Sequence, residues 1–252
     1  PIKKQPVRME QICLLVILTT MPVIFGAVQS WIWSWYASAV YLTFLSAYWR
    51  RKVRLRDNGL GAVWAVYLFF AWTLFQVAPL PDGLLGRLSP FRAGLLDRAR
   101  ELAGVTGIRP SMAYVYRLAL QRWILWLAAF VLAMLVSAAC RERGFLKSLT
   151  VMLLVVGGLE ALYGLVQAMV PTTGVLGYQR TGLGDARGTF INRNHFAGMI
   201  EMIWPLGLGY LLSLSPWREK IKLRHLINSD YFNRQLLIAI VLVVMFLALI
   251  FS

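Results

Sequence analysis

The stretch Arg187–Glu201 holds the side chains of this chain that are best suited to chemistry. Its polar residues precede an apolar run, and they are Arg187, Asn192, Arg193, Asn194 and His195. An asparagine can cap a helix that begins here, and the free N–H groups of a helix start attract anions. Arg180 adds another phosphate-binding side chain, while Gly184 and Gly188 let the backbone approach a ligand closely. An outward-facing phosphate pocket and an interfacial loop of lipid-facing arginines both fit this pattern, and the residues alone slightly favour the loop.

Glu201 is a carboxylate inside the apolar run that follows. Its spacing from Asn194 and Gly198 puts the three residues on one face of a helix. An ionisable group is costly inside a membrane helix, so we expect Glu201 to face other helices and to have a partner. The candidate partners are Arg187, Arg193 or an arginine elsewhere in the chain. Orientation of an arginine is favoured here over direct acid–base work.

A second polar group lies on one helix face of the preceding apolar run, at Glu160, Tyr163, Gly164 and Gln167. Gln167 lies near the end that leads to the arginine-rich stretch, so it can reach the same pocket. For Glu160 we favour a buried hydrogen-bonding role between helices over a role in chemistry. For His195 we favour a structural hydrogen-bond donor over a general base.

Long apolar segments must position these residues. Hydrophobic residues make up 59% of the chain and the mean hydropathy is +0.63, which is typical of membrane proteins and not of soluble domains. We therefore predict an all-α, polytopic helical membrane protein. The about seven predicted transmembrane helices cover residues 11–28, 31–49, 60–78, 118–140, 148–170, 194–214 and 236–251.

The formal net charge of +15 comes from basic residues that lie mainly between the apolar runs. This placement is what membrane topology requires, so it does not indicate nucleic-acid binding. The densest basic clusters, such as Arg50–Arg56, fall on one side of the predicted bundle. The positive-inside rule then places the N-terminus in the cytoplasm and Arg187–Glu201 at the periplasmic face. We expect the cytoplasmic clusters to meet anionic lipid headgroups.

A long connection over residues 79–117 separates the third and fourth apolar runs. Ser89 followed by Pro90 is typical of a helix N-cap with proline at the first helical position, and Gly104 is a suitable stop. Between them apolar residues recur at helical spacing, at Phe91, Leu95, Ala99 and Leu102. An amphipathic helix on the membrane surface and a packed lid over the bundle both fit this pattern.

The run Gly188–Gly198 reads GTFINRNHFAG and is followed by Glu201 and Pro205. It resembles the signature of the O-antigen ligase and polysaccharide polymerase superfamily. The earlier run Tyr163–Gln167, which reads YGLVQ, is similar to the end of that family's preceding helix. The likeness is specific over residues 149–214. It implies a metal-independent membrane glycosyltransferase of the GT-C type, without a cofactor, in the bacterial inner membrane.

The resemblance also implies what such a chain acts on. A glycan would move from an undecaprenyl-diphosphate carrier to an acceptor sugar at the periplasmic face. Arg187 is then the first candidate contact to the diphosphate and Arg193 the second, while Asn192, Asn194 and Glu201 shape the pocket. Membrane lipids and polysaccharide-assembly proteins are further expected partners.

Members of this family have more helices than the predicted runs supply. We therefore expect residues 1–147 to form N-terminal transmembrane helices, with the 79–117 loop at the periplasmic side. Residues 148–252 would begin a ligase- or polymerase-like core of a larger bundle. The family's catalytic histidine lies in its second half, so the catalytic residue is unknown. The alternative function is a non-catalytic membrane subunit that binds a lipid-linked glycan intermediate; a transporter is less favoured, because the chain has no internal repeat.

Overall fold

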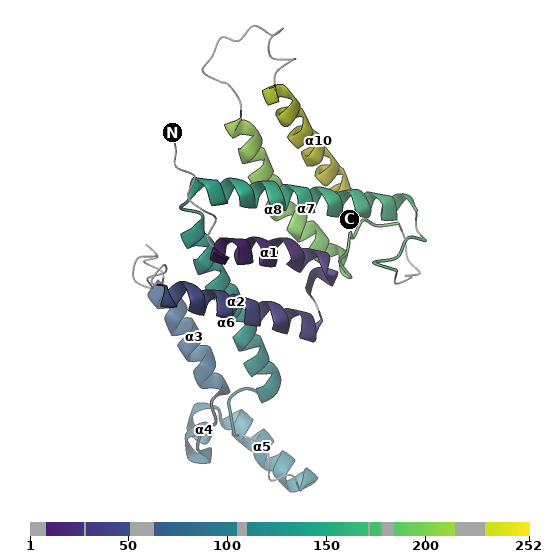
Figure 1. The fold of residues 1–252 in the computed structure, drawn as a ribbon. Helices are drawn as coiled ribbons and strands as arrows, with labels where there is room; N and C mark the ends of the chain where they lie inside the picture. Colours follow the sequence, from purple (N-terminus) through teal and green to yellow (C-terminus); the bar gives the residue numbers. More distant parts are fainter. Residues whose placement is uncertain are drawn as a thin grey trace. The chain divides into compact units, whose positions relative to one another are not determined.

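The structure is a computed structural model that describes residues 9–27, 29–50, 63–104, 110–170, 172–177, 184–214 and 230–252. Within these ranges the chain consists of α-helices, a short 3-10 turn and connecting loops, which confirms the predicted all-α class (Figure 1). Arg180 and residues 51–56 of the densest basic cluster lie outside the described residues, as do the basic residues Arg218, Lys220, Lys222 and Arg224.

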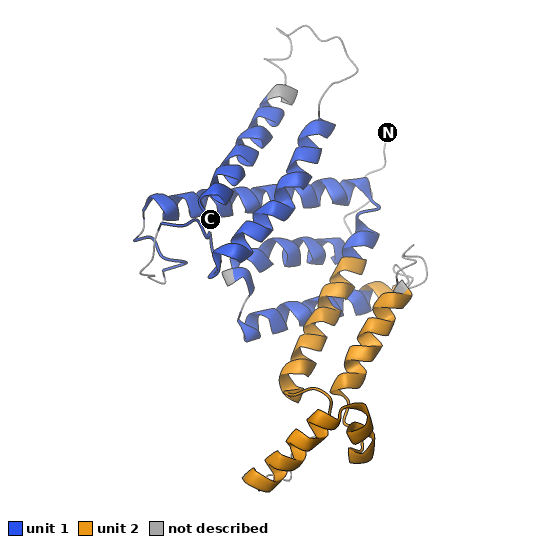
Figure 2. Cartoon of the chain, turned by 180° about the vertical axis from the view of Figure 1, so that it is seen from behind, with its two compact units in different colours: residues 1–46, 135–252 blue, residues 47–134 orange. Residues whose placement is uncertain are grey.

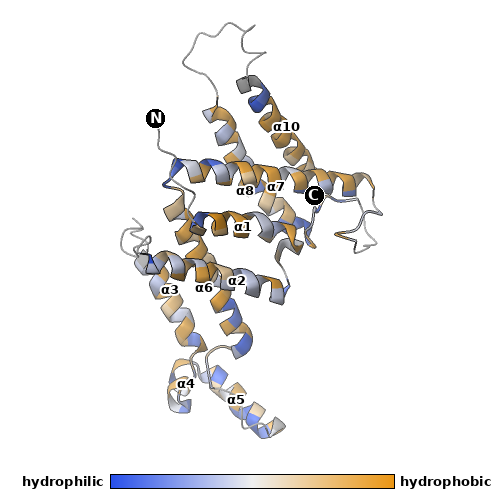
Figure 3. Ribbon diagram, viewed as in Figure 1, coloured by the Kyte–Doolittle hydropathy of each residue, from blue (hydrophilic) through white to orange (hydrophobic). Residues whose placement is uncertain are grey.

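The helices keep the labels of Figure 1. Their bounds are α1 Met9–Val23, α2 Ser30–Trp49, α3 Val63–Val77, α4 Asp82–Leu88, α5 Pro90–Ala103, α6 Tyr116–Ala139, α7 Arg143–Met169, α8 Arg193–Ser213 and α10 Asp230–Ile250. A 3-10 turn over Phe25–Ala27 follows α1. Figure 3 shows hydrophobic residues along most of α10, whereas α5 mixes hydrophobic and hydrophilic residues.

Within the described ranges, four helices are long and apolar enough to cross a membrane: α6, α7, α8 and α10. They match four of the about seven predicted spans, and the other three are not confirmed. The apolar helices α1 and α3 have 15 residues each, or about 22 Å against a hydrocarbon core of about 30 Å. α2 has 20 residues, but its serines, tyrosines and tryptophans lower its hydropathy. α1 ends early because Pro22 lies in its last turn and Gly26 follows with a left-handed φ of 60°.

The chain forms two compact units, which Figure 2 distinguishes by colour. Unit 1 comprises residues 1–46 and 135–252, and unit 2 comprises residues 47–134. The position near 147, at which the sequence analysis divides the chain, therefore falls inside unit 1. The N-terminal helix α1 belongs to the same unit as the arginine-rich stretch.

The core of unit 1 is built by α7, α8 and α10, which pack against one another, with α1 against α7. Phe196 and Ile200 of α8 are fully buried there, as is Met245 of α10. Glycines allow the close approach. A side chain at Gly157 would meet Met245 Cε at 3.1 Å, and one at Gly207 would meet Leu154 Cδ2 at 2.5 Å. Small residues at helix contacts are the usual means of tight packing between membrane helices.

In unit 2 the predicted helix boundaries of the 79–117 connection are confirmed. α5 has Ser89 at its N-cap and Pro90 in its first turn, and it ends at Gly104 with a left-handed φ of 60°. Leu96 of α5 is buried against Leu80 and Leu85, and Ala93 of the same helix packs beside them.

The apolar face expected for α5 is largely open. Phe91 is 72% exposed and Leu102 is 88% exposed. Arg92 faces the other way, because its guanidinium donates to the carbonyl oxygens of Ser111 and Ala113 and lies 5.0 Å from the ring centre of Tyr114. Leu96 packs as a lid residue would, while the outer apolar face stays available to a membrane surface.

Candidate functional site

The loop of residues 184–192 is attached to α7 by a buried carboxylate. Glu160 is 4% exposed and accepts the backbone N–H of Thr189 at 2.7 Å and its hydroxyl at 2.8 Å. The same hydroxyl lies 3.1 Å from the carbonyl oxygen of Pro22, which the end of α1 leaves without an intrahelical partner. Glu160 was expected to bond between helices. It instead bonds the loop that leads into α8.

Gln167, two turns further along α7, forms hydrogen bonds with the backbone of the same loop. Its amide nitrogen donates to the carbonyl oxygen of Gly188 at 2.9 Å, and its amide oxygen accepts the N–H of Arg187 at 3.2 Å. The amide nitrogen also lies 3.2 Å from the carbonyl oxygen of Gly174, to which Tyr163 donates its hydroxyl at 2.7 Å. The predicted polar face of α7 therefore holds the two loops that follow the helix.

Gly188 makes the approach of the loop to α7 possible. It has a left-handed φ of 56°, and a side chain there would collide with a carboxylate oxygen of Glu160 and with the ring of Phe196. Gly184 is similar, since a side chain would meet the carbonyl oxygen of Ala168 at 2.6 Å. From the sequence, these glycines were expected to allow the close approach of a ligand. In the structure the groups that approach them belong to the protein itself.

Asp185 interacts with two arginines, Arg187 in the loop and Arg193 at the start of α8. Its carboxylate accepts two hydrogen bonds from Arg187, from Nε and from a terminal nitrogen, each at 2.6 Å. A guanidinium nitrogen of Arg193 lies 3.6 Å from the same carboxylate. The hydrogen bonds from Arg187, with the charges of both arginines, lower the pKa of Asp185 below its ordinary value. Two guanidinium groups and one carboxylate leave the cluster with a net positive charge.

The two arginines differ in accessibility. The Arg187 side chain is 19% exposed and also donates to the carbonyl oxygen of Ile191. The Arg193 side chain is 56% exposed. Either Asn192 or Asn194 could cap α8 on sequence grounds, and Asn192 does so, because its side-chain oxygen accepts the N–H of Asn194 at 2.9 Å. His195 is exposed beside them. Exposed polar side chains at the start of α8 thus lie next to a loop that is held by buried hydrogen bonds.

The position expected for Glu201 is wrong. Its side chain is exposed, and within the described part of the chain it has no ion pair with an arginine. The residues that α8 buries instead are Phe196, Met199, Ile200, Ile203 and Gly207. α8 is apolar on most of its circumference, so the spacing of polar residues did not identify the buried face. Arg187, the first expected partner of Glu201, is bound to Asp185 instead.

Two residues of this cluster were missed in the sequence. Asp185 carries a usable signal, because a carboxylate two residues before an arginine in a short loop can bind it directly. Thr189 carries none, because its partner Glu160 lies 29 residues earlier in the chain and only the tertiary fold brings them together.

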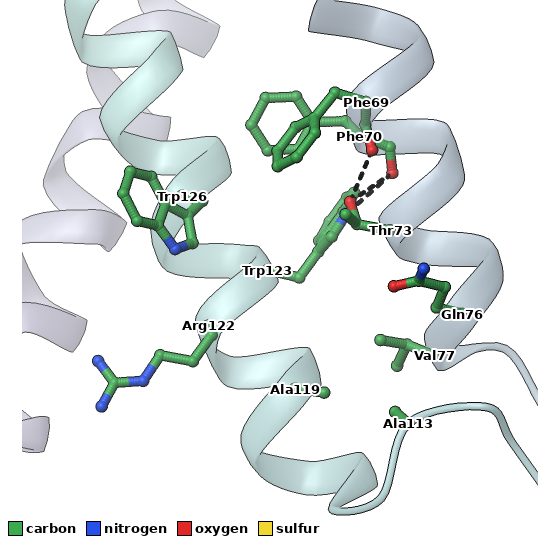
Figure 4. A pocket seen from close by; sticks show the side chains of 10 residues that line it. All are labelled: Phe69, Phe70, Thr73, Gln76, Val77, Ala113, Ala119, Arg122, Trp123 and Trp126. Carbon is green, nitrogen blue, oxygen red and sulfur yellow. Dashed lines mark hydrogen bonds between the residues drawn. The ribbon is translucent and has the colours of Figure 1, made fainter. Parts of the chain in front are cut away.

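Unit 2 contains a separate groove between α3 and α6, with a volume of about 240 Å³ (Figure 4). Phe69, Phe70 and Trp123 supply most of its aromatic lining, and Trp123 donates its ring N–H to the carbonyl oxygen of Phe70. Figure 4 shows the Thr73 side chain directed toward α6, whereas Arg122 extends away from α3. The groove is mainly an aromatic helix contact and lacks the paired charges of the loop cluster.

The described residues form an all-helical protein with four helices long and apolar enough to cross a membrane, and with a hydrogen-bonded polar loop before α8. Comparison of the chain with family models, with curated proteins and with solved structures finds no match. The interpretation of the loop therefore depends on its own geometry and on the resemblance of its sequence.

Proposed function

We propose that this chain binds the diphosphate of an undecaprenyl-linked glycan at the start of α8 and acts in transfer of that glycan to a sugar acceptor, as a polysaccharide polymerase or O-antigen ligase. One observation carries the proposal. The segment that resembles the family signature, Gly188–Gly198, begins with a loop that buried hydrogen bonds attach to α7, and it continues into the first turns of α8, where Arg193, Asn194 and His195 are exposed.

The charge of the cluster suits a diphosphate. Arg187 and Arg193 converge on Asp185, and the N-terminus of α8 adds its positive dipole end. Arg193 is the more exposed arginine, so we assign it the first phosphate contact. Arg187 is held in place by its two hydrogen bonds to Asp185, and it supplies the second guanidinium group of the site. A ligand that finds both guanidinium groups already oriented loses less entropy on binding.

The same positioning would favour transfer chemistry. Diphosphate is a good leaving group, and fixed arginines stabilise the negative charge that develops on it as the glycosidic bond breaks. A base must still remove the proton of the acceptor hydroxyl. We assign no residue of this chain to that step.

One observation favours a second candidate function, a membrane subunit that binds the lipid-linked intermediate without catalysing transfer. Glu160 and Asp185, the carboxylates of the cluster, are both occupied by hydrogen bonds within the protein. Neither is free to act as the base. A binding subunit would need the arginines and the loop, but no base.

The proposal includes a topology. With the N-terminus in the cytoplasm and about seven spans, the start of α8 faces the periplasm of a bacterial inner membrane, where lipid-linked glycans are assembled. The support is the distribution of lysines and arginines along the chain.

The test compares Arg193→Ala and Arg187→Ala with Arg98→Ala, which removes an exposed arginine in unit 2. We expect Arg193→Ala to weaken binding of a fluorescent undecaprenyl-diphosphate sugar by about tenfold or more, since a charge-assisted contact contributes about 1.5–3 kcal/mol. We expect Arg187→Ala to abolish polymer formation in cells while membrane insertion is kept. Unchanged binding together with unchanged polymer length and yield would sink the proposal. Polymer formation that survives the loss of binding would argue for an unrelated function.

A further inference from the structure

A groove lies between α7, α8 and α10 in unit 1, with a volume of about 280 Å³. Val151 and Val155 of α7 and Leu237 of α10 supply apolar walls. Lys147 and Arg234 also line it, from near the starts of α7 and α10. The groove thus combines an apolar body with two cations.

This groove is distinct from the candidate site, which is formed by Glu160, Asp185 and the arginines Arg187 and Arg193. Lys147 and Gln167 lie near opposite ends of α7, roughly twenty residues or about 30 Å apart along the helix. On α8, the groove touches Tyr210 and Leu214 at the end of the helix, whereas Arg193 stands at its start. The two places are therefore separated by about the thickness of a hydrocarbon core. An inference about the groove does not depend on the proposed function.

The charges of the groove indicate that its ligand is an anion. Lys147 and Arg234 are both exposed, and no ion pair is found for either within the part of the chain that the structure describes. No acidic side chain is among the described residues that line the groove. Two cations with no acidic side chain among the described lining residues favour an anion that carries more than one oxygen, such as a phosphate group.

The apolar walls of the groove indicate that the ligand also has a hydrocarbon part. Val155 is 55% exposed and Leu237 is 63% exposed, so apolar surface beside the cations is uncovered. Beside the groove, Gln235 of α10 donates its side-chain amide to the carbonyl oxygen of Leu214 at 3.0 Å. A phosphate with a hydrocarbon chain fits both features, whereas inorganic phosphate would leave the apolar walls uncovered. Basic pockets between membrane helices are known sites for anionic lipid headgroups.

We propose that this groove is a binding site for a phosphate-bearing lipid. The headgroup lies between Lys147 and Arg234, and one hydrocarbon chain packs along α7 and α10. An anionic phospholipid and a polyprenyl phosphate share this chemistry, and the experiment separates the two sources.

The test is native mass spectrometry of the full chain in detergent, titrated with phosphatidylglycerol. The probes for comparison are phosphatidylcholine with the same acyl chains and undecaprenyl phosphate. The variant Lys147→Gln/Arg234→Gln removes both cations. The matched control Arg87→Gln/Arg98→Gln removes two exposed arginines of unit 2. A further variant, Val155→Phe, fills the wall and leaves both cations in place.

We expect the wild type to bind phosphatidylglycerol in preference to phosphatidylcholine. The double glutamine variant should bind it roughly 10- to 30-fold more weakly, because each cation near a membrane surface contributes to anionic lipid binding. Val155→Phe should also weaken binding, and the unit 2 control should match the wild type. Stronger, charge-dependent binding of undecaprenyl phosphate identifies the carrier lipid as the occupant and supports the site. Equal affinity in all variants, or equal binding of phosphatidylcholine, overturns the proposal.

Discussion

Both carboxylate oxygens of Glu160 are occupied by one residue, Thr189, which donates its backbone N–H at 2.7 Å and its hydroxyl at 2.8 Å. A side chain inside an otherwise apolar helix thereby fixes the loop that begins α8. Because α7 sets the conformation of the loop, the exposed residues at the start of α8 are free to contact a ligand.

Thr189→Val tests this relationship, because valine keeps the shape of threonine and removes the hydroxyl. One oxygen of buried Glu160 then loses its side-chain donor. We expect the free energy of unfolding to fall by about 1–3 kcal/mol, measured by denaturant titration in detergent micelles. Thr189→Ser keeps the hydroxyl and should stay within about 1 kcal/mol of the wild type. Equal stability of the valine and serine variants would show that the hydroxyl contributes little.

Gly188→Ala separates backbone strain from close approach. Gly188 and Gly104 have nearly the same left-handed φ, 56° and 60°, but nothing lies within 4 Å of a side chain added at Gly104. Gly104→Ala should therefore cost about 1–2 kcal/mol through strain alone. Gly188→Ala should cost more, because the added carbon collides with Glu160 and Phe196. Thermal unfolding of both variants in the same detergent checks this order, and equal losses would contradict the close approach.

The Asp185–Arg187 pair predicts an acid-sensitive loop. Hydrogen bonds from Arg187 lower the pKa of Asp185 in the folded protein below its ordinary value of 3.8. A carboxyl group with a lowered pKa stabilises the fold above its unfolded pKa, and this contribution disappears as pH falls through the folded value. The difference in Tm between wild type and Asp185→Asn should thus be constant above about pH 5 and shrink below about pH 4. A difference that does not change with pH would remove the ion pair as its cause.

Two leucines of α5 should respond differently to truncation. Leu96 is 2% exposed and Leu102 is 88% exposed. Leu96→Ala should destabilise unit 2 by about 2–4 kcal/mol through loss of buried surface and a residual cavity. Leu102→Ala should leave stability nearly unchanged and weaken association of the protein with liposomes, if α5 lies on a membrane surface. Limited proteolysis and liposome flotation measure the two effects. Loss of stability from Leu102→Ala would instead favour a lid.

The sequence predicted the features that depend on neighbouring residues. Ser89, Pro90 and Gly104 act through local backbone chemistry, and α5 begins and ends where they indicate. Asn192 caps α8 for the same reason. The apolar runs of α6, α7, α8 and α10 were also found, because an uncharged run of this length is a strong signal.

Features that depend on the three-dimensional fold were not accessible in this way. Glu160 meets Thr189 across a separation of 29 residues, and no local pattern connects them. Glu201 was assigned to the wrong side of α8, because an apolar helix gives little contrast between its faces. Asp185 was overlooked, although its spacing from Arg187 is a local signal.

The attachments of the loop also imply an order of assembly. Thr189 lies beside the carbonyl oxygen of Pro22, 167 residues earlier, and the N–H of Ala186 donates to the carbonyl oxygen of Phe251 at 2.7 Å. Such contacts between distant parts of a chain form late, because many residues must be ordered first. The bond between Ala186 and Phe251 can therefore form only after α10 has docked. During synthesis on the ribosome, the start of the loop at Ala186 would therefore lack this attachment until the last of these helices is in place.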